Sequence, residues 1–248
     1  MRGTLLALLC AVPALAASPP RFVKVICNSY FFPGGYPSPC TGAGATTGDL
    51  VVVHLGWLYG TSANATNVTD GVHNYTSSGP NCYLNYNVYM HYAQWYGSLP
   101  STAWLTYTFT PSPGGTYQSM LVVEYSGAAA SNVLDTGASA QNCATGQPTS
   151  IPYTFNFGGV TTTGANETIV CGLVSYGGTP YVLGTGFADL AENSGWVNVG
   201  SEDMAAASAT SYGTTINTST SAPYDTAGGC VSYIGAASAA TRGQMILW

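Results

Sequence analysis

Short runs of β-branched and aromatic residues recur along the chain and are separated by Gly- and Pro-rich turns. Leu50–Trp57 and Ser119–Gly127 are nearly continuous apolar runs, whereas Trp104–Thr110 alternates large apolar residues with threonine. Runs of both kinds are typical of β-strands, and no segment has the 3.6-residue periodicity of an amphipathic helix. The pattern therefore predicts an all-β fold of about ten to twelve short strands.

The regular spacing of these runs predicts how the strands pack. Short strands joined by frequent turns are typical of a β-sandwich or jelly roll. We expect a single antiparallel β-sandwich of jelly-roll type, stapled by disulfides, over residues 48–248. An N-terminal strand and a Pro/Gly-rich loop over residues 17–47 precede it. Asn166–Tyr176 echoes Asp49–Trp57 in its polar start, apolar run and glycine, so each half contributes a matching strand.

Residues 1–16 have the features of a secretory signal peptide. Arg2 supplies the positive start, Leu5–Val12 the short apolar region and Ala14–Ala16 an A-x-A cleavage site. The apolar run is too short to span about 30 Å of hydrocarbon, which disfavours a retained membrane anchor. We therefore expect a secreted protein, extracellular or at the cell surface, with no transmembrane segment after cleavage.

Charged residues are scarce. They make up 6% of the chain, whereas 46% of residues are hydrophobic and 12% aromatic, a composition that argues against disorder. Cleavage after residue 16 leaves Arg21, Lys24 and Arg242 against ten acidic residues. Because phosphate binding requires clustered Lys and Arg, nucleic acid is not an expected partner.

The cysteines predict a disulfide framework. Those that remain after cleavage are even in number, as expected for a secreted chain: Cys27, Cys40, Cys82, Cys143, Cys171 and Cys230. Proximity in the sequence favours the pair Cys27–Cys40. For the other four cysteines we predict the pairs Cys82–Cys143 and Cys171–Cys230, although the sequence alone does not fix the pairing. A metal site is not expected, because no C-x-x-C motif occurs.

N-x-S/T sequons predict sites for N-linked glycans. They begin at Asn64, Asn67, Asn74, Asn166 and Asn217. The clustering of the first three indicates an exposed loop over residues 64–76.

The order of several short motifs resembles a group of largely uncharacterised secreted prokaryotic jelly-roll proteins. The motifs are Gly48-Asp-Leu-Val-Val-Val53, Val68-x-Asp70 with Asn74-Tyr75, Met90-x-Tyr92-Ala93, Thr106-x-Thr108-Phe109, Glu124-Tyr-Ser-Gly127 and Leu134-Asp135. The resemblance covers residues 45–248 and implies a concanavalin-like sandwich without an established active site. The cysteines and the many tyrosines depart from the group's usual pattern.

Glu124 is the one candidate catalytic residue. A carboxylate inside an apolar strand is expected to have a raised pKa, as a general acid requires, and Val-Glu-Tyr is similar to the nucleophile strand of a jelly-roll xylanase family. Glycoside hydrolysis needs a second carboxylate, and Glu167, Glu192, Glu202 and Asp203 are the available partners. We expect Glu124 to be structural and no enzyme activity, with a glycosidase as the least favoured function.

No motif predicts a metal or cofactor. His54, His73 and His91 lack the spacing of a zinc site. Asp49, Asp70, Asp135 and Asp189 stand at loop ends, where extracellular sandwiches hold calcium, but no D-x-D-x-D-G loop is present. We expect no cofactor, with calcium as the alternative.

Aromatic residues are concentrated between Tyr83 and Tyr96. Rings exposed on a sheet face stack on sugars and form contact surfaces for proteins. With side chains alternating between faces, we predict Tyr89, His91 and Trp95 as the outward, ligand-binding set.

Together these features predict a non-enzymatic extracellular structural or adhesive subunit. Its partners would be copies of itself or other surface proteins, and the N-terminal segment would form filaments by donating a strand to a neighbour. The alternative is a carbohydrate-binding module that holds polysaccharide on the aromatic strand over residues 83–96.

Overall fold

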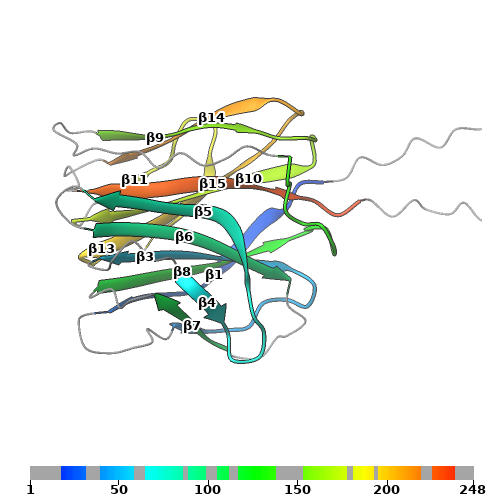
Figure 1. Ribbon diagram of the computed structural model, residues 1–248. Helices are drawn as coiled ribbons and strands as arrows, with labels where there is room; N and C mark the ends of the chain where they lie inside the picture. The colour runs from blue at the N-terminus through cyan, green and yellow to red at the C-terminus, as the bar shows by residue number, and fades with distance from the viewer. Residues whose placement is uncertain are drawn as a thin grey trace, which may run out of the picture.

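The computed structural model describes residues 18–31, 40–58, 65–85, 89–98, 105–111, 117–137, 153–177, 181–192, 195–218 and 225–237. The regular structure in these ranges is β-strand throughout, arranged in antiparallel sheets (Figure 1). The predicted all-β sandwich class is confirmed, whereas the jelly-roll type stays a prediction. Within the same ranges there is no helix long and apolar enough to cross a membrane.

Two sheets are built from the first half of the chain. The larger has the order β1 (Arg21–Phe31), β8 (Tyr117–Ser126), β3 (Leu50–Leu58), β6 (Tyr89–Ser98), β5 (Thr76–Asn85). The smaller has the order β2 (Cys40–Gly42), β7 (Leu105–Pro111), β4 (Ala65–Thr69). A shared apolar cluster joins residues of β2 and β4 to one face of the larger sheet.

Two further sheets are built from the second half. The larger has the order β12 (Ala188–Glu192), β13 (Val197–Ala205), β10 (Glu167–Tyr176), β15 (Thr226–Ile234). The smaller has the order β11 (Tyr181–Val182), β14 (Ser211–Thr218), β9 (Tyr153–Thr161). The two larger sheets pack face to face, so the described strands form four stacked layers (Figure 1). The sandwich therefore has one more sheet on each outer face than the sequence predicted.

The two halves have the same strand topology. The order β8-β3-β6-β5 corresponds to β15-β10-β13-β12, and β2-β7-β4 corresponds to β9-β14-β11. The strands whose sequences echo each other, β3 and β10, occupy equivalent central positions. β1 extends the first half beside β8, and part of the linker after β8 pairs with the end of β15 through the bridge Leu134↔Tyr233.

Both faces of β3 are covered, which explains its continuous apolar sequence. Leu50, Val52 and Leu58 face the second half of the chain, whereas the alternate residues from Val51 to Trp57 face the sheet of β2, β7 and β4. All nine residues of β3 are buried. Because burial of one Val or Leu side chain is worth about 1.5–3 kcal/mol, these layers dominate the stability of the fold.

Glycines let the two larger sheets approach closely at β3 and β10. A Cβ added at Gly56 would collide with Val174, and one at Gly172 would collide with His54 and the Tyr92 hydroxyl. Beside Gly172 runs a buried polar chain, in which Tyr92 Oη lies 2.8 Å from His54 Nδ1 and donates to Gln94 Oε1 at 3.0 Å. Gln94 Nε2 in turn donates to the hydroxyl of Tyr233 at 3.0 Å, which links the two halves.

Candidate functional site

Glu124 lies in a structural cluster that fastens β1 and the segment before β3 to β8. Its side chain is fully buried. Oε1 accepts a hydrogen bond from the Thr46 backbone N–H at 2.6 Å, and Lys24 Nζ lies 3.2 Å from Oε2. Lys24 also donates to the Gly44 carbonyl at 3.1 Å, so one carboxylate orders two neighbouring segments.

The expectation of a raised pKa at Glu124 is wrong. Burial opposes ionisation, but the Thr46 N–H, the Thr46 side chain and Lys24 outweigh it and hold the pKa of Glu124 below its usual value. The carboxyl group with a raised pKa is that of Asp49. Burial and a hydrogen bond to the Glu124 carboxylate raise its pKa to about 6. Below about pH 6 the pair therefore holds a proton on Asp49, while the negative charge stays on Glu124.

This pair does not have the geometry of a glycosidase site. Retaining enzymes hold their two carboxyl groups about 5–5.5 Å apart so that the sugar fits between them. Asp49 and Glu124 share a hydrogen bond, which leaves no such space.

The other acids predicted as partners of Glu124 are engaged elsewhere. Glu167 accepts hydrogen bonds from Ser232 Oγ at 2.6 Å and Thr163 Oγ1 at 3.2 Å. Glu192 accepts one from the Tyr181 N–H, Glu202 accepts one from the Gly184 N–H, and Asp203 is hydrogen-bonded to Tyr125. Each carboxylate fixes a local backbone or hydroxyl group.

His54 and His91 have different buried environments. His54 is in the buried polar chain, and burial lowers its pKa to about 3. His91 is stacked on Trp57 with ring centroids 4.9 Å apart, and burial lowers its pKa to about 4. Over the described ranges no group of three or more His, Cys, Asp or Glu side chains could hold a metal ion.

The predicted outward aromatic set is wrong for His91. His91 and Ala93 share a face of β6 with Trp95, as the alternation predicted, but that face meets the apolar layer beneath the β2-β7-β4 sheet. His91 is buried, and Trp95 is half-buried against the same layer. The side chain of Tyr89 lies outside the described part of the structure.

Two predicted disulfides are confirmed, Cys27–Cys40 and Cys171–Cys230. The first joins β1 to β2, and the second joins directly opposed residues of β10 and β15. Cys82 is also disulfide-bonded, but its predicted partner, Cys143, lies outside the described residues.

The predicted glycan acceptors differ in exposure. Asn67 and Asn74 are exposed, whereas Asn166 is half-buried and donates to the Gly235 carbonyl at 3.3 Å. Asn64 and the side chain of Asn217 lie outside the described part. Glycosylation at these positions stays a prediction.

A group of aromatic rings, in which Trp196 is exposed and three tyrosines are half-buried, lies at one end of the larger sheets. We call it the Trp196 cluster: Tyr30 at the end of β1, Tyr117 at the start of β8, Tyr176 at the end of β10 and Trp196 just before β13. Trp196 is 54% exposed. Its ring centroid lies 6.4 Å from that of Tyr117, with 15° between the ring planes, and 6.1 Å from that of Tyr176.

Backbone hydrogen bonds hold Trp196 in place. The Gly177 N–H donates to the Trp196 carbonyl at 3.0 Å. The buried Asn198 side chain joins the same two turns, because its Nδ2 donates to the Gly177 carbonyl at 2.7 Å and its Oδ1 accepts from the Gly195 N–H. The exposed indole is thus held by two hydrogen-bonded turns of the second half.

Sequence reasoning missed this cluster because its members are distant in the chain. The one local signal is Gly195-Trp196, a bulky ring beside a turn glycine where a strand begins. No family model, curated protein or solved structure matches this chain.

Proposed function

We propose that the protein is a secreted, non-enzymatic adhesive subunit that binds polysaccharide through the Trp196 cluster. The observation that carries this proposal is the 54% exposure of Trp196 beside the stacked ring of Tyr117. Flat aromatic surfaces with hydroxyl groups at their edges suit sugar rings, which present apolar faces and polar rims. The cluster contains no charged side chain, which favours a neutral polymer.

Retention on insoluble polysaccharides tests the proposal. Wild-type protein and Trp196→Ala are passed over cellulose, chitin and xylan, with Val182→Ala, which trims another exposed side chain, as the control. We expect Trp196→Ala to lose retention at an unchanged melting temperature, because stacking contacts on an exposed ring contribute to binding and little to folding. Equal retention of both variants would contradict a sugar-binding role for this surface.

Filament formation by strand donation is the lesser candidate. β1 already occupies the edge of its own sheet, paired with β8 from Arg21↔Ser126 to Phe31↔Gln118, and Cys27–Cys40 tethers it to β2. Donation to a neighbour would require β1 to leave β8 while remaining tethered. Deletion of residues 18–30 followed by size-exclusion chromatography and electron microscopy tests it, and assembly that survives the deletion would exclude donation.

A further inference from the structure

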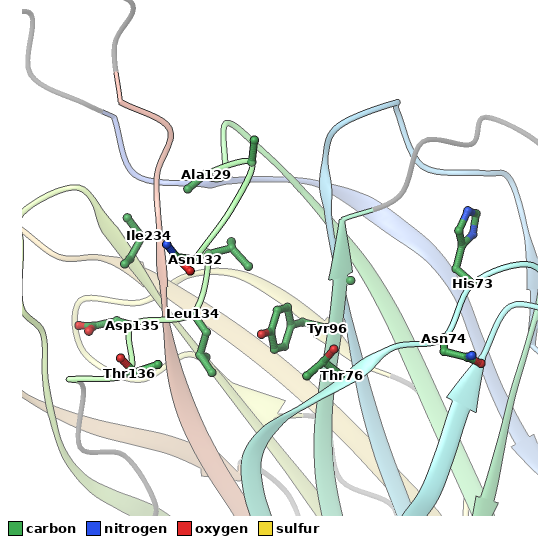
Figure 2. Close-up of a pocket in the computed structure, with 13 residues that line it drawn as sticks. His73, Asn74, Thr76, Tyr96, Ala129, Asn132, Leu134, Asp135, Thr136 and Ile234 are labelled. Carbon is green, nitrogen blue, oxygen red and sulfur yellow. The ribbon is translucent and has the colours of Figure 1, made fainter.

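A pocket of about 790 Å³ opens beside the linker between the two halves. The linker, residues 127–137, forms one wall, and the ends of β6 and β15 with the start of β5 form the others (Figure 2). Its lining includes His73, Thr76, Tyr96, Asn132, Leu134 and Ile234. The volume lies within the roughly 300–1,000 Å³ typical of small-molecule sites.

Backbone pairing gives the linker wall a fixed shape. The chain leaves β8 through Gly127, whose φ of 75° is in the left-handed region. It then pairs with the end of β15, where the Ala129 N–H donates to the Ile234 carbonyl and the Ile234 N–H donates to the Val133 carbonyl, at 2.9 and 2.7 Å. The linker wall of the pocket is therefore held in place by its pairing with β15.

Asn132 is the residue of this wall whose conformation needs an explanation. Its φ of 51° places a non-glycine residue in the left-handed region, a conformation that costs free energy and is often found at binding sites. Its side chain is exposed and lines the pocket. In Figure 2, Asn132 lies on the wall that also carries Leu134, and Tyr96 and Thr76 lie beside Leu134.

On the opposite side of the pocket, Asp70 orients the imidazole of His73. The buried Asp70 carboxylate accepts the Val72 and His73 backbone N–H groups at 2.8 and 2.6 Å and lies 3.0 Å from His73 Nδ1. The contact between Nδ1 and this carboxylate fixes the orientation of the ring and leaves Nε2 for other partners. His73 is therefore a fixed polar group at the pocket.

The carboxylate of Asp135, which belongs to the described part of the pocket wall, is turned toward the backbone. Asp135 Oδ1 accepts the Gly137 N–H and Oδ2 accepts the Thr163 N–H, both at 2.9 Å. Among the described residues that line the pocket there is no Lys or Arg. The pocket thus offers amide, hydroxyl and imidazole groups together with the ring of Tyr96 and several aliphatic side chains, a combination that suits a neutral ligand rich in hydroxyl groups.

We infer that this pocket binds a neutral sugar unit, either a free monosaccharide or the terminal unit of a longer chain. The site is separate from the Trp196 cluster, because the cluster meets β8 at Tyr117 and the pocket lies beyond Ser126 at its other end. At about 3.3 Å per residue, the two sites are on the order of 30 Å apart. Binding here does not depend on the proposed function.

Titration calorimetry and saturation-transfer NMR with glucose, galactose, mannose and N-acetylglucosamine, and with their trisaccharides, test the inference. Asn132→Gly removes the amide and still permits a positive φ, and Ser131→Gly on the same linker is its control, because Ser131 is exposed and does not line the pocket. Loss of one ligand hydrogen bond should weaken binding about fivefold in Asn132→Gly, with no change in Ser131→Gly. Ala130→Trp, which places a large ring in the pocket from an exposed position, should abolish binding.

The same titrations distinguish the two sources of the sugar. Equal affinity for a monosaccharide and its trisaccharide indicates a free sugar, and tighter binding of the trisaccharide indicates a chain end. Binding that survives in Ala130→Trp, or a wild-type protein that binds no member of the panel, overturns the inference. Binding lost in Trp196→Ala but kept in Ala130→Trp would place the sugar on the Trp196 cluster instead. Because Asn74 begins a sequon and lines the pocket, mass spectrometry first establishes that Asn74 is unmodified.

Discussion

Lys24 on β1 and Glu124 on β8 are register partners, and Lys24 Nζ lies 3.2 Å from Glu124 Oε2. The two residues contribute unequally to the stability of the fold, because the Lys24 side chain is 40% exposed whereas that of Glu124 is fully buried. Glu124 also accepts the Thr46 N–H, so its loss leaves two partners unsatisfied. The pair therefore offers a direct comparison between a buried and a solvent-screened partner of one contact.

Glu124→Ala, which removes the acceptor of the Thr46 N–H, should lower the free energy of unfolding by at least about 1.5–3 kcal/mol, the value of hydrogen bonds to a charged group. Lys24→Met should cost about 1 kcal/mol or less, since solvent screens its charge. Urea denaturation of both variants checks this order. A Lys24→Met variant as unstable as Glu124→Ala would show that the ion pair, and not the buried hydrogen bond to Thr46, stabilises this edge of the sheet.

Asp49 should make stability fall as the pH rises through about 6. Burial and the Glu124 carboxylate raise the pKa of Asp49 from 3.8 to about 6, so the folded state holds this proton more tightly than the unfolded state. The resulting contribution is complete below pH 3.8 and is lost as the pH rises through the folded-state value.

Asp49→Asn removes this loss, because the amide cannot ionise beside Glu124. Above pH 6 the variant should unfold at a higher temperature than the wild type, with a gain of about 1–2 kcal/mol after allowance for the partial exposure of Asp49. The difference should shrink toward pH 4. Calorimetric melting between these pH values measures it, and a constant difference across the range would contradict the assigned cause.

Ionisation of Glu202 should cause a second fall in stability, at a more alkaline pH. Its carboxyl group is buried, and burial raises its pKa from 4.5 to about 8 despite the hydrogen bond from the Gly184 N–H. The folded state binds the proton more tightly, so stability is fully present below pH 4.5 and is lost as the pH rises through 8. Between these two pH values the folded state binds about one proton more than the unfolded state, so the free energy of unfolding falls by about 1.4 kcal/mol for each pH unit.

Glu202→Gln should flatten this part of the stability curve, because the amide oxygen still accepts from Gly184 and cannot ionise. Glu192→Gln is the matched control, since it removes an exposed carboxylate from the same sheet. Guanidinium titrations from pH 5 to pH 9 give the slopes. If Glu202→Gln and the wild type lose stability in parallel, another group titrates in this range.

The sequence predicts the individual strands well because their signals are local. The uninterrupted apolar runs of β3 and β8 indicate burial on both faces, and alternation correctly puts His91 and Trp95 on one face of β6. Which layer covers that face depends on β2 and β4, whose few residues carry no signal of their position. His91 was therefore assigned to the wrong environment.

The candidate sites could not be predicted, because they are assembled from distant segments. Tyr30, Tyr117, Tyr176 and Trp196 meet only because β1, β8, β10 and β13 share one end of the stack. At the other end His73 and Asn74 meet the Leu134-Asp135 motif around the pocket only because the linker pairs with β15. Long-range pairing of this kind has no local pattern in the sequence.

Gly172 gives the sharpest test of the close approach between the two halves. A Cβ at this position would collide with His54 Nδ1 and Tyr92 Oη, whereas a Cβ at Gly213 would meet nothing within 4 Å. Gly172→Ala should lower the free energy of unfolding by about 2–4 kcal/mol, because it strains the packing and breaks the hydrogen bond between the two side chains. Gly213→Ala should change it by no more than about 0.5 kcal/mol. Urea denaturation compares them, and Tyr92→Phe added to Gly172→Ala should recover part of the loss by removing the colliding oxygen. A Gly172→Ala protein as stable as Gly213→Ala would mean that β3 and β10 are not held in the close contact described here.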